Sequence, residues 1–182
     1  KDKTLESNLN LTATASGFGF DYRTMRSNIN YDLKNSNILN KQINSSGGQV
    51  NLNSGNVDLD VFILSPTLNG KVKGTANIRN IDNPSYDLAG DFRNLDISDF
   101  TREPSQKSNL TFKFVAKGSG LSPDEIAGNF KIDFSPSSYN TLFIPGINIM
   151  ADVSSTAGEK TLRLESEVLD LTAKGKFGFT DI

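Results

Sequence analysis

"SNLNLTATASGFGF", from Ser7 to Phe20, recurs as "SNLTFKFVAKGSGL", from Ser108 to Leu121. The two stretches lie 101 residues apart and share the opening Ser-Asn-Leu and a pair of glycines near the end. Between these, apolar side chains alternate with polar ones, which is the pattern of a β-strand with one apolar face. The two stretches therefore predict strands, and they predict that the chain repeats itself.

The repeat continues beyond these two stretches without a gap. Alternation alone would match apolar positions by chance half the time, but it does not explain polar and glycine identities that keep one register. We interpret residues 1–182 as a fragment of a longer repeat protein, with two tandem units of about 101 residues (about 1–101 and 102–182, the second truncated). The offset pairs Ser7 with Ser108, Asn28 with Asn129, Asp32 with Asp133, Ser65 with Ser166 and Gly74 with Gly175.

The composition limits the classes of function. A net charge of −2 over 182 residues offers no basic footprint, so no nucleic-acid partner is expected. The chain has no Cys and no His, which removes thiolate zinc sites, Cys nucleophiles and the commonest general base. No apolar run approaches the roughly 18 residues of a transmembrane helix. We expect neither a metal site nor a cofactor.

Period-two alternation recurs along the chain, for example at Val57, Leu59, Val61 and Ile63. Turn-forming residues separate the alternating runs, and we predict breaks at residues 46–48, 53–56 and 157–159. Only residues 122–126 resemble a helix start, of one turn at most. The fold class expected is all-β: an elongated, repeating sheet of about a dozen strands, which would be roughly 30 Å long if they stacked in two facing layers.

Candidate catalytic groups are weak. Without His, a Ser nucleophile would need a Lys base, and Ser119 lacks the strand-to-helix context of a nucleophile elbow. Asp58 and Asp60 flank Leu59 on an alternating strand, so both should lie on a solvated face. We expect no enzymatic activity. The carboxylate pairs are Asp58/Asp60, Asp96/Asp99 and Asp124/Glu125.

Lysines flank the repeated glycines Gly74 and Gly175. They could contact lipid phosphates, but charge that discourages edge-to-edge pairing of strands is the simpler interpretation. The residues are Lys71, Lys73, Lys174 and Lys176.

The alternating apolar side chains are the candidate site. On the residues alone, either two facing sheets fill the space between them as in a sandwich, or the apolar face lines an open groove. The predicted groove-lining residues are Leu9, Leu11, Ile29, Tyr31, Leu33, Val61, Ile63, Phe112, Phe114, Phe130, Ile132, Phe134, Phe143, Ile149, Leu162, Leu164, Leu171 and Phe177.

Two stretches carry a family pattern: "NLTFKFVAKGSGLSPDEIAGNFKIDFSPSSYN" (109–140) and "KTLRLESEVLDLTAKGKFGFTDI" (160–182). A strand, a Gly-rich turn, "IAGNF" and a further strand, followed later by "LDLTAKGKF", resemble the translocation-and-assembly-module TamB proteins. Within the wider AsmA-like group, the pattern is most similar to that of the Bacteroidota branch. The first half matches more loosely.

The resemblance implies a sheet curled into a taco-like groove with an apolar interior. It further implies a periplasmic bridge of a Gram-negative bacterium, anchored in the inner membrane, that binds phospholipid acyl chains and moves phospholipid between the membranes. One alternative is a scaffold that pairs strands with nascent outer-membrane proteins, beside an outer-membrane β-barrel partner (TamA-like). A second alternative is a structural sandwich that serves as a spacer or adhesin. Edge-to-edge self-association of the fragment is also expected.

Overall fold

The computed structural model describes residues 7–38, 40–122, 124–156 and 159–176. Within them the chain forms thirteen antiparallel strands, one four-residue helix and one short 3-10 segment, so the all-β prediction is confirmed. The strands are β1 (Leu11–Phe18), β2 (Arg26–Ile38), β3 (Lys41–Asn53), β4 (Asn56–Ser65), β5 (Leu68–Asn77), β6 (Ser85–Leu95), β7 (Ser108–Ser119), β8 (Ala127–Phe134), β9 (Ser137–Tyr139), β10 (Leu142–Ile144), β11 (Ile147–Thr156), β12 (Glu159–Ser166) and β13 (Asp170–Gly175). The helical segments are α1 (Ser98–Thr101) and η1 (Pro104–Gln106).

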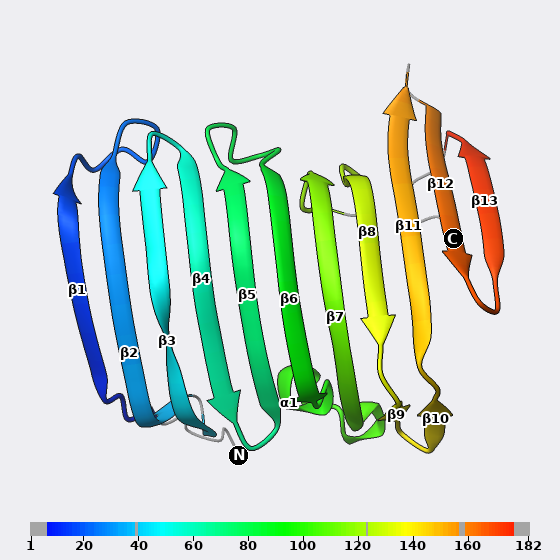
Figure 1. The fold of residues 1–182 in the computed structure, drawn as a ribbon, viewed down its shortest axis with the longest axis horizontal. Helices are drawn as coiled ribbons and strands as arrows, with labels where there is room; N and C mark the ends of the chain where they lie inside the picture. Colours follow the sequence, from blue (N-terminus) through cyan, green and yellow to red (C-terminus); the bar gives the residue numbers. More distant parts are fainter. Residues whose placement is uncertain (1–6, 39, 123, 157–158, 177–182) are drawn as a thin grey trace, which may run out of the picture.

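The strands form one open sheet in which chain neighbours are also neighbours in space (Figure 1). Eleven strands follow each other from β1 to β13, and the β9–β10 hairpin is inserted between β8 and β11 and pairs with the start of β7. Two facing layers do not form among the described residues, which make a single open sheet. Antiparallel strands can be joined by short turns, whereas parallel strands need long crossover connections. A chain of strands separated by short turns therefore folds as a meander.

The tight turn between β3 and β4 shows why the chain reverses where it does. Ser54 and Gly55 are its two central residues, with φ angles of 50° and 81°. Positive φ at both central positions is the signature of a type I′ turn, whose twist matches that of the flanking strands. The predicted break at residues 53–56 is therefore confirmed.

The sheet has almost no buried core among the described residues. Among the described residues, only Leu33, Pro84, Leu110 and Val153 are apolar side chains less than 9% exposed, and no side chain is fully buried. Apolar residues are instead shielded by their cross-strand neighbours, at the spacing where opposed side chains touch. The described part of the chain therefore relies on strand pairing and on contacts within one layer.

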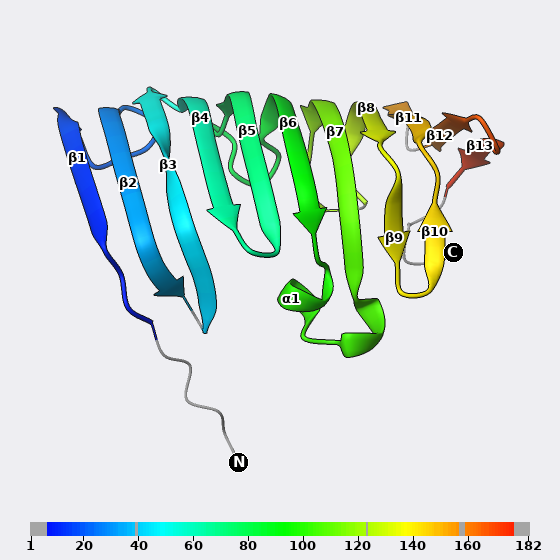
Figure 2. The same ribbon diagram turned by 60° about the horizontal axis from the view of Figure 1, so that its bottom comes forward.

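The lower parts of several strands turn away from the plane of the main sheet, as Figure 2 shows for β7 and for the β9–β10 hairpin. Two buried serines, Ser36 and Ser137, lie in these lower parts and are 2% and 5% exposed. The backbone amide of Asn10 donates to the Ser36 hydroxyl (2.8 Å), and the backbone amide of Thr111 donates to the Ser137 hydroxyl (2.9 Å). Each hydroxyl donates in turn to the carbonyl two residues before it. Both serines thus satisfy backbone groups of two neighbouring strands.

These two serine sites are related by the offset of 101 residues, and so is most of the strand pairing. Leu11 pairs with Leu33 and Phe112 with Phe134, both in the same register. The pairs of β2 with β3 reappear as β8 with β11 and as β9 with β10. The pairs of β4 with β5 reappear as β12 with β13. Much of the strand pairing thus repeats at this offset within the described residues.

One pair of strands departs from the offset. Val50 pairs with Leu59 in the first half, whereas the equivalent Ala151 pairs with Leu164 rather than with Lys160. The difference is an even number of residues, and side chains alternate with a period of two. The slip therefore leaves the same side chains on the same face.

Three local predictions are corrected. Residues 46–48 lie in the middle of β3, not at a break, because their two glycines allow close approach of β4. Lys71 and Lys73 lie in β5, an interior strand, so they do not protect an edge. Around residue 122 the backbone makes one turn, in which the Ile126 amide donates to the Ser122 carbonyl (2.9 Å); the helical segments are α1 and η1, which were not predicted.

Candidate functional site

Four rows of cross-strand neighbours run across one side of the sheet, and none of their members carries a charge. We call these rows the apolar face. One row crosses all eleven strands: Ala15, Ile29, Val50, Leu59, Gly74, Leu88, Ala116, Phe130, Ala151, Leu164 and Leu171. The others begin at Leu11, Ala13 and Gly17 and end at Ile147, Ser166 and Ala173.

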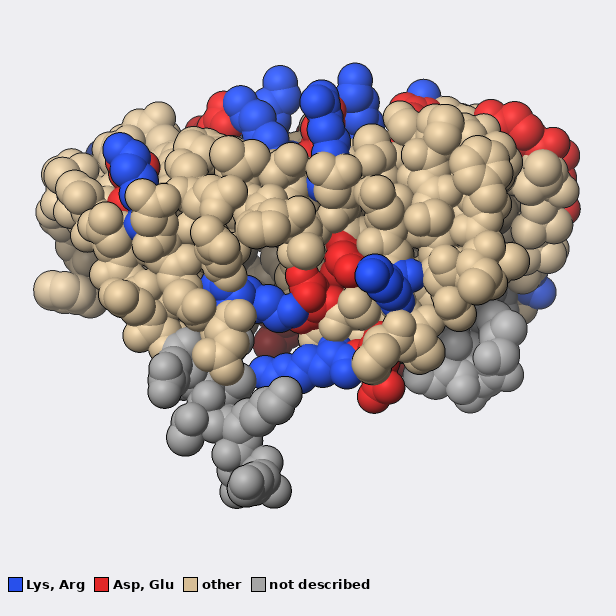
Figure 3. Space-filling model, turned by 90° about the horizontal axis from the view of Figure 1, so that it is seen from below, with Lys and Arg blue, Asp and Glu red and all other residues tan. Residues whose placement is uncertain are grey.

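Charged residues gather on the opposite side, the polar face. Lys71, Asp91, Lys113 and Asp133 follow one another across β5 to β8. Figure 3 views the sheet along its strands and shows Lys and Arg side chains projecting from the upper margin, the side toward the viewer in Figure 1. The pairs on this face are exposed, as between Lys71 and Asp60 (3.1 Å), and each contributes about 0–1 kcal/mol.

Nearly all of the predicted groove residues share the apolar face. Leu9 precedes β1 and is 54% exposed, and Phe143 lies in β10, outside the eleven-strand path, and is 72% exposed. Phe177 lies outside the described residues. The residues that the pairing places together are Leu11, Ile29, Tyr31, Leu33, Val61, Ile63, Phe112, Phe114, Phe130, Ile132, Phe134, Ile149, Leu162, Leu164 and Leu171.

Four phenylalanines form the densest part of this face. The Phe92 ring centroid lies 5.4 Å from that of Phe112 and 5.9 Å from that of Phe114, and Phe112 lies 5.3 Å from Phe134. Aromatic pairs at such separations add about 0.5–1.5 kcal/mol beyond the area that they bury. These rings connect β6, β7 and β8 without help from a second layer.

Glycines make room for the rings on neighbouring strands. A Cβ atom on Gly90 would lie 2.3 Å from the Phe114 ring, and one on Gly70 would lie 2.5 Å from the Phe92 ring. Real Cβ atoms do not come this close, so each ring lies over the bare backbone of its partner. The alternation of glycine and phenylalanine across strands thus keeps the face smooth.

Sequence reasoning missed part of this face, chiefly on β6. Tyr86, Leu88 and Phe92 alternate in the required way and point to the apolar face. The Tyr86 hydroxyl donates to the Gly120 carbonyl (3.1 Å), and burial raises the pKa of this phenol. The period-two pattern at residues 86–92 was the signal that could have identified them.

The segment between β6 and β7 carries α1 to the lower end of β3. Asp99 in α1 accepts hydrogen bonds from Lys41 at the start of β3 and from Thr67 in the β4–β5 turn. Burial raises the pKa of the Asp99 carboxyl, but these hydrogen bonds and the Lys41 charge outweigh it and leave the pKa below its ordinary value. Asp96 and Asp99 therefore do not act as a pair. Asp96 accepts hydrogen bonds from Ser98 and Ser108 within its own segment, whereas Asp99 binds Lys41 and Thr67.

The other carboxylate pairs are exposed. Asp60 pairs with Lys71 (3.1 Å), Asp124 pairs with Lys160 (3.4 Å), and Glu125 accepts from the Ser122 hydroxyl (3.0 Å).

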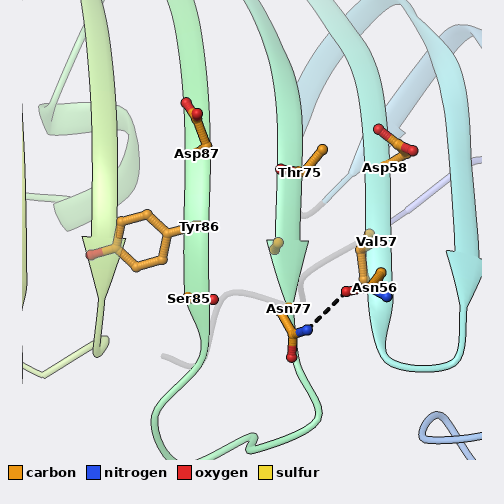
Figure 4. Close-up of a pocket in the computed structure, with 9 residues that line it drawn as sticks. Asn56, Val57, Asp58, Thr75, Asn77, Ser85, Tyr86 and Asp87 are labelled. Atoms are coloured by element: carbon orange, nitrogen blue, oxygen red, sulfur yellow. Dashed lines mark hydrogen bonds between the residues drawn. The ribbon is translucent and has the colours of Figure 1, made fainter.

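An open depression of about 430 Å³ lies at the ends of β4, β5 and β6. Figure 4 shows Asp58, Thr75 and Asp87 in a row across these strands and the Tyr86 ring turned toward β7. Asp87 is paired with Lys117 (2.9 Å) and Asp58 is exposed. The depression is therefore lined by side chains at the strand ends that are already in contact with water.

Metal-ligating side chains do not cluster in threes anywhere in the described ranges. The helical segments of those ranges are too short to cross a membrane. Comparison with models of protein families, with curated proteins and with solved structures gives no match. The function proposed below therefore rests on the resemblance in sequence and on the geometry of the sheet.

Proposed function

We propose that this chain is a segment of a TamB-like periplasmic bridge whose apolar face holds the acyl chains of phospholipids on their way between the inner and outer membranes. The supporting observation is the continuous apolar face, which carries no charge in four rows and has no facing sheet among the described residues. Curling of the sheet about this face would make it the interior of a taco-like groove.

The energetics favour transfer without chemistry. Apolar area removed from water contributes about 25 cal/mol per Å², so an acyl chain gains from any stretch of this face. Because apolar side chains recur in the rows from β1 to β13, an acyl chain finds comparable contacts along most of the face. Many weak and comparable contacts allow an acyl chain to slide along the groove.

The location follows from the same proposal. The full-length protein is anchored in the inner membrane of a Gram-negative bacterium and spans the periplasm, and this segment supports outer-membrane biogenesis as part of the span. Its partners are phospholipids and, at the far end, an outer-membrane β-barrel protein. No cofactor takes part.

Site-specific photo-crosslinking in the full-length protein tests the proposal. A benzoylphenylalanine at position 114 should capture phospholipid, whereas the same probe at position 113, one residue along β7 and on the polar face, should not. Capture at neither position, or equally at both, would refute the proposal.

A second candidate function is strand pairing with client proteins, and β1 favours it. β1 pairs only with β2 among the described strands, all eight of its residues are exposed, and it carries no charge. β13, at the other edge, carries Asp170 and Lys174. An uncharged edge is the more open to augmentation by another strand.

Self-association reports on this edge. We expect the chain to associate at millimolar concentration and the variant Thr14→Lys, which adds a charge to β1, to associate much less. Sedimentation velocity measures the difference. A strict monomer would count against strand pairing at β1.

A further inference from the structure

A cavity of about 310 Å³ lies where α1 meets the apolar face. Its floor comes from Ile43 of β3, Ile63 of β4 and Leu68 of β5, and Phe100 of α1 contributes to its wall. Figure 3 shows charged side chains around a hollow below the middle of the sheet. The volume is at the lower end of the range of small-molecule sites, about 300–1,000 Å³.

Polar bonds hold α1 in place. The helix has no buried residue, and Phe100 is 65% exposed. Lys41 and Thr67 instead bind the Asp99 carboxylate, and the Asp96 amide donates to the Thr67 carbonyl (3.2 Å). We call Lys41, Thr67 and Asp99 the tether. Because their polar groups bind one another, the surface of the cavity is mainly apolar.

The residues that bind α1 in the first half are not repeated in the second half. The offset of 101 places Leu142 at the position of Lys41 and Val168 at that of Thr67, and these side chains are 66% and 78% exposed. Neither Leu142 nor Val168 can supply the hydrogen bonds that Lys41 and Thr67 donate to Asp99.

A cation lies at the opening of the cavity. Arg102 follows α1 and lines the cavity, its side chain is exposed, and it makes no ion pair with a described residue. Lys41, by contrast, is neutralised by Asp99. An apolar pocket with one uncompensated guanidinium at its rim is complementary to an amphiphile with an anionic head.

We propose that this cavity is a closed-end site for the terminal part of one acyl chain whose anionic head lies beside Arg102. The proposal rests on the proposed function, because it makes the cavity a place where a chain on the apolar face is held. Elsewhere on the face a chain can slide, but the wall formed by α1 stops it here.

A closed end has a measurable signature. Each buried methylene should tighten binding about fourfold, from roughly 0.8 kcal/mol per CH₂. The gain must stop once the cavity is full, whereas on an open face it would continue. Titration calorimetry with hexanoate, octanoate, decanoate and dodecanoate, each below its micelle concentration, should therefore show one site per chain and an affinity that first rises and then levels off.

Matched variants locate the site. Ile43→Trp fills the cavity and should abolish the saturable binding of decanoate, whereas Ile144→Trp, at the equivalent position 101 residues later, should leave it unchanged. Arg102→Glu should weaken decanoate binding about tenfold or more but should hardly affect decanol, which lacks the charge. Far-ultraviolet circular dichroism checks that each variant is folded.

The outcomes separate the two proposals. If decanoate binds Ile43→Trp as it binds the wild type, or if affinity rises through dodecanoate without levelling, the closed-end site is refuted while the crosslinking at position 114 still stands. If Ile43→Trp does not fold, the chain-length series and Arg102→Glu remain sufficient to refute it. Absence of lipid crosslinking at position 114 with saturable decanoate binding would refute the proposed function alone.

Discussion

Lys113 and Phe114 are neighbours in β7, but they belong to opposite faces of the sheet. Lys113 lies between Asp91 and Asp133 on the polar face, where charges alternate from strand to strand. Phe114 lies over Gly90 and stacks on Phe92. One side of the strand is thus built from exposed charge pairs and the other from shape-matched apolar contacts.

The difference between the faces indicates on which of them residues can be exchanged less freely. An exposed pair contributes about 0–1 kcal/mol and can be exchanged for another polar pair. A ring that lies on a glycine requires that glycine, and the apolar rows must stay in phase across eleven strands. Changes on the apolar face should therefore have larger effects than changes on the polar face.

The largest effect is expected from a charge on the apolar face. In Phe114→Asp the carboxylate can reach water, so we expect a loss of about 1–2 kcal/mol in the free energy of unfolding, rather than the ~3–5 kcal/mol of an unpaired buried charge. Photo-crosslinking of phospholipid by the full-length protein should nevertheless fall about tenfold or more, because the acyl chain loses a continuous apolar surface. Ile132→Glu, opposite it on β8, should behave alike.

Urea denaturation and lipid crosslinking of the same variants measure both quantities. Unfolding of Phe114→Asp would mean that the face is a closed core, and the groove would then be wrong.

Gly90→Ala makes a steric change on the same face, and Gly47→Ala is its match on the polar face. The new methyl group would lie 2.3 Å from the Phe114 ring and 2.8 Å from the Lys71 carbonyl oxygen, so the strands must shift. The methyl group at Gly47 would lie 3.1 Å from the Phe62 ring. We expect a loss of about 1–3 kcal/mol for Gly90→Ala and clearly less for Gly47→Ala. Equal losses in urea denaturation would show that the two faces are equally tolerant.

These glycines also show how far the sequence could predict the fold. Alternation identified the strands whose apolar residues are large, such as β4 and β7, and the common parity of their apolar residues predicted most of the candidate face. A break was predicted inside β3 because Gly47 and Gly48 have the composition of a turn. Their place in a strand is explained by the Phe62 ring and the Val61 backbone that lie beside them. Local patterns do not contain such cross-strand contacts.

The helix α1 and the cavity beside it were beyond prediction for the same reason. Residues 98–101 carry no helical periodicity, and their position depends on Lys41, which lies 58 residues away in sequence. Which sheet face remains open likewise depends on how many layers form, and alternation is the same for a sandwich and for a single sheet.

The buried serines test the comparison between the two halves of the chain. Ser137→Ala leaves the Thr111 amide without its partner, and Ser36→Ala does the same to the Asn10 amide. Each of these part-buried hydrogen bonds contributes about 0.5–1.5 kcal/mol. We expect losses in this range that agree with each other, measured by urea denaturation. A large loss in one variant and none in the other would argue against equivalent units.

Acid should release α1 without unfolding the sheet. The pKa of Asp99 is lowered in the folded chain, so its tether stabilises α1 above the ordinary Asp pKa of about 3.9 and is lost as the pH falls through the lower folded value. Fluorescence of Phe100→Trp should stay constant from pH 7 to about 4 and change below. Asp99→Asn should remove this transition, and a transition near pH 6 would contradict the assignment.

The smallest effect is expected for Lys113→Glu, and it completes the comparison with its neighbour Phe114. The substitution puts a glutamate between Asp91 and Asp133, so it replaces an attraction by a repulsion. All of these groups reach water, which screens both interactions, and we expect a loss of about 0.5–1 kcal/mol that shrinks further in high salt. Lipid crosslinking through position 114 should be unchanged, since the new charge lies on the other side of the sheet. A loss of crosslinking as large as that of Phe114→Asp would mean that lipid meets the polar face, and the distinction between the two faces would fail.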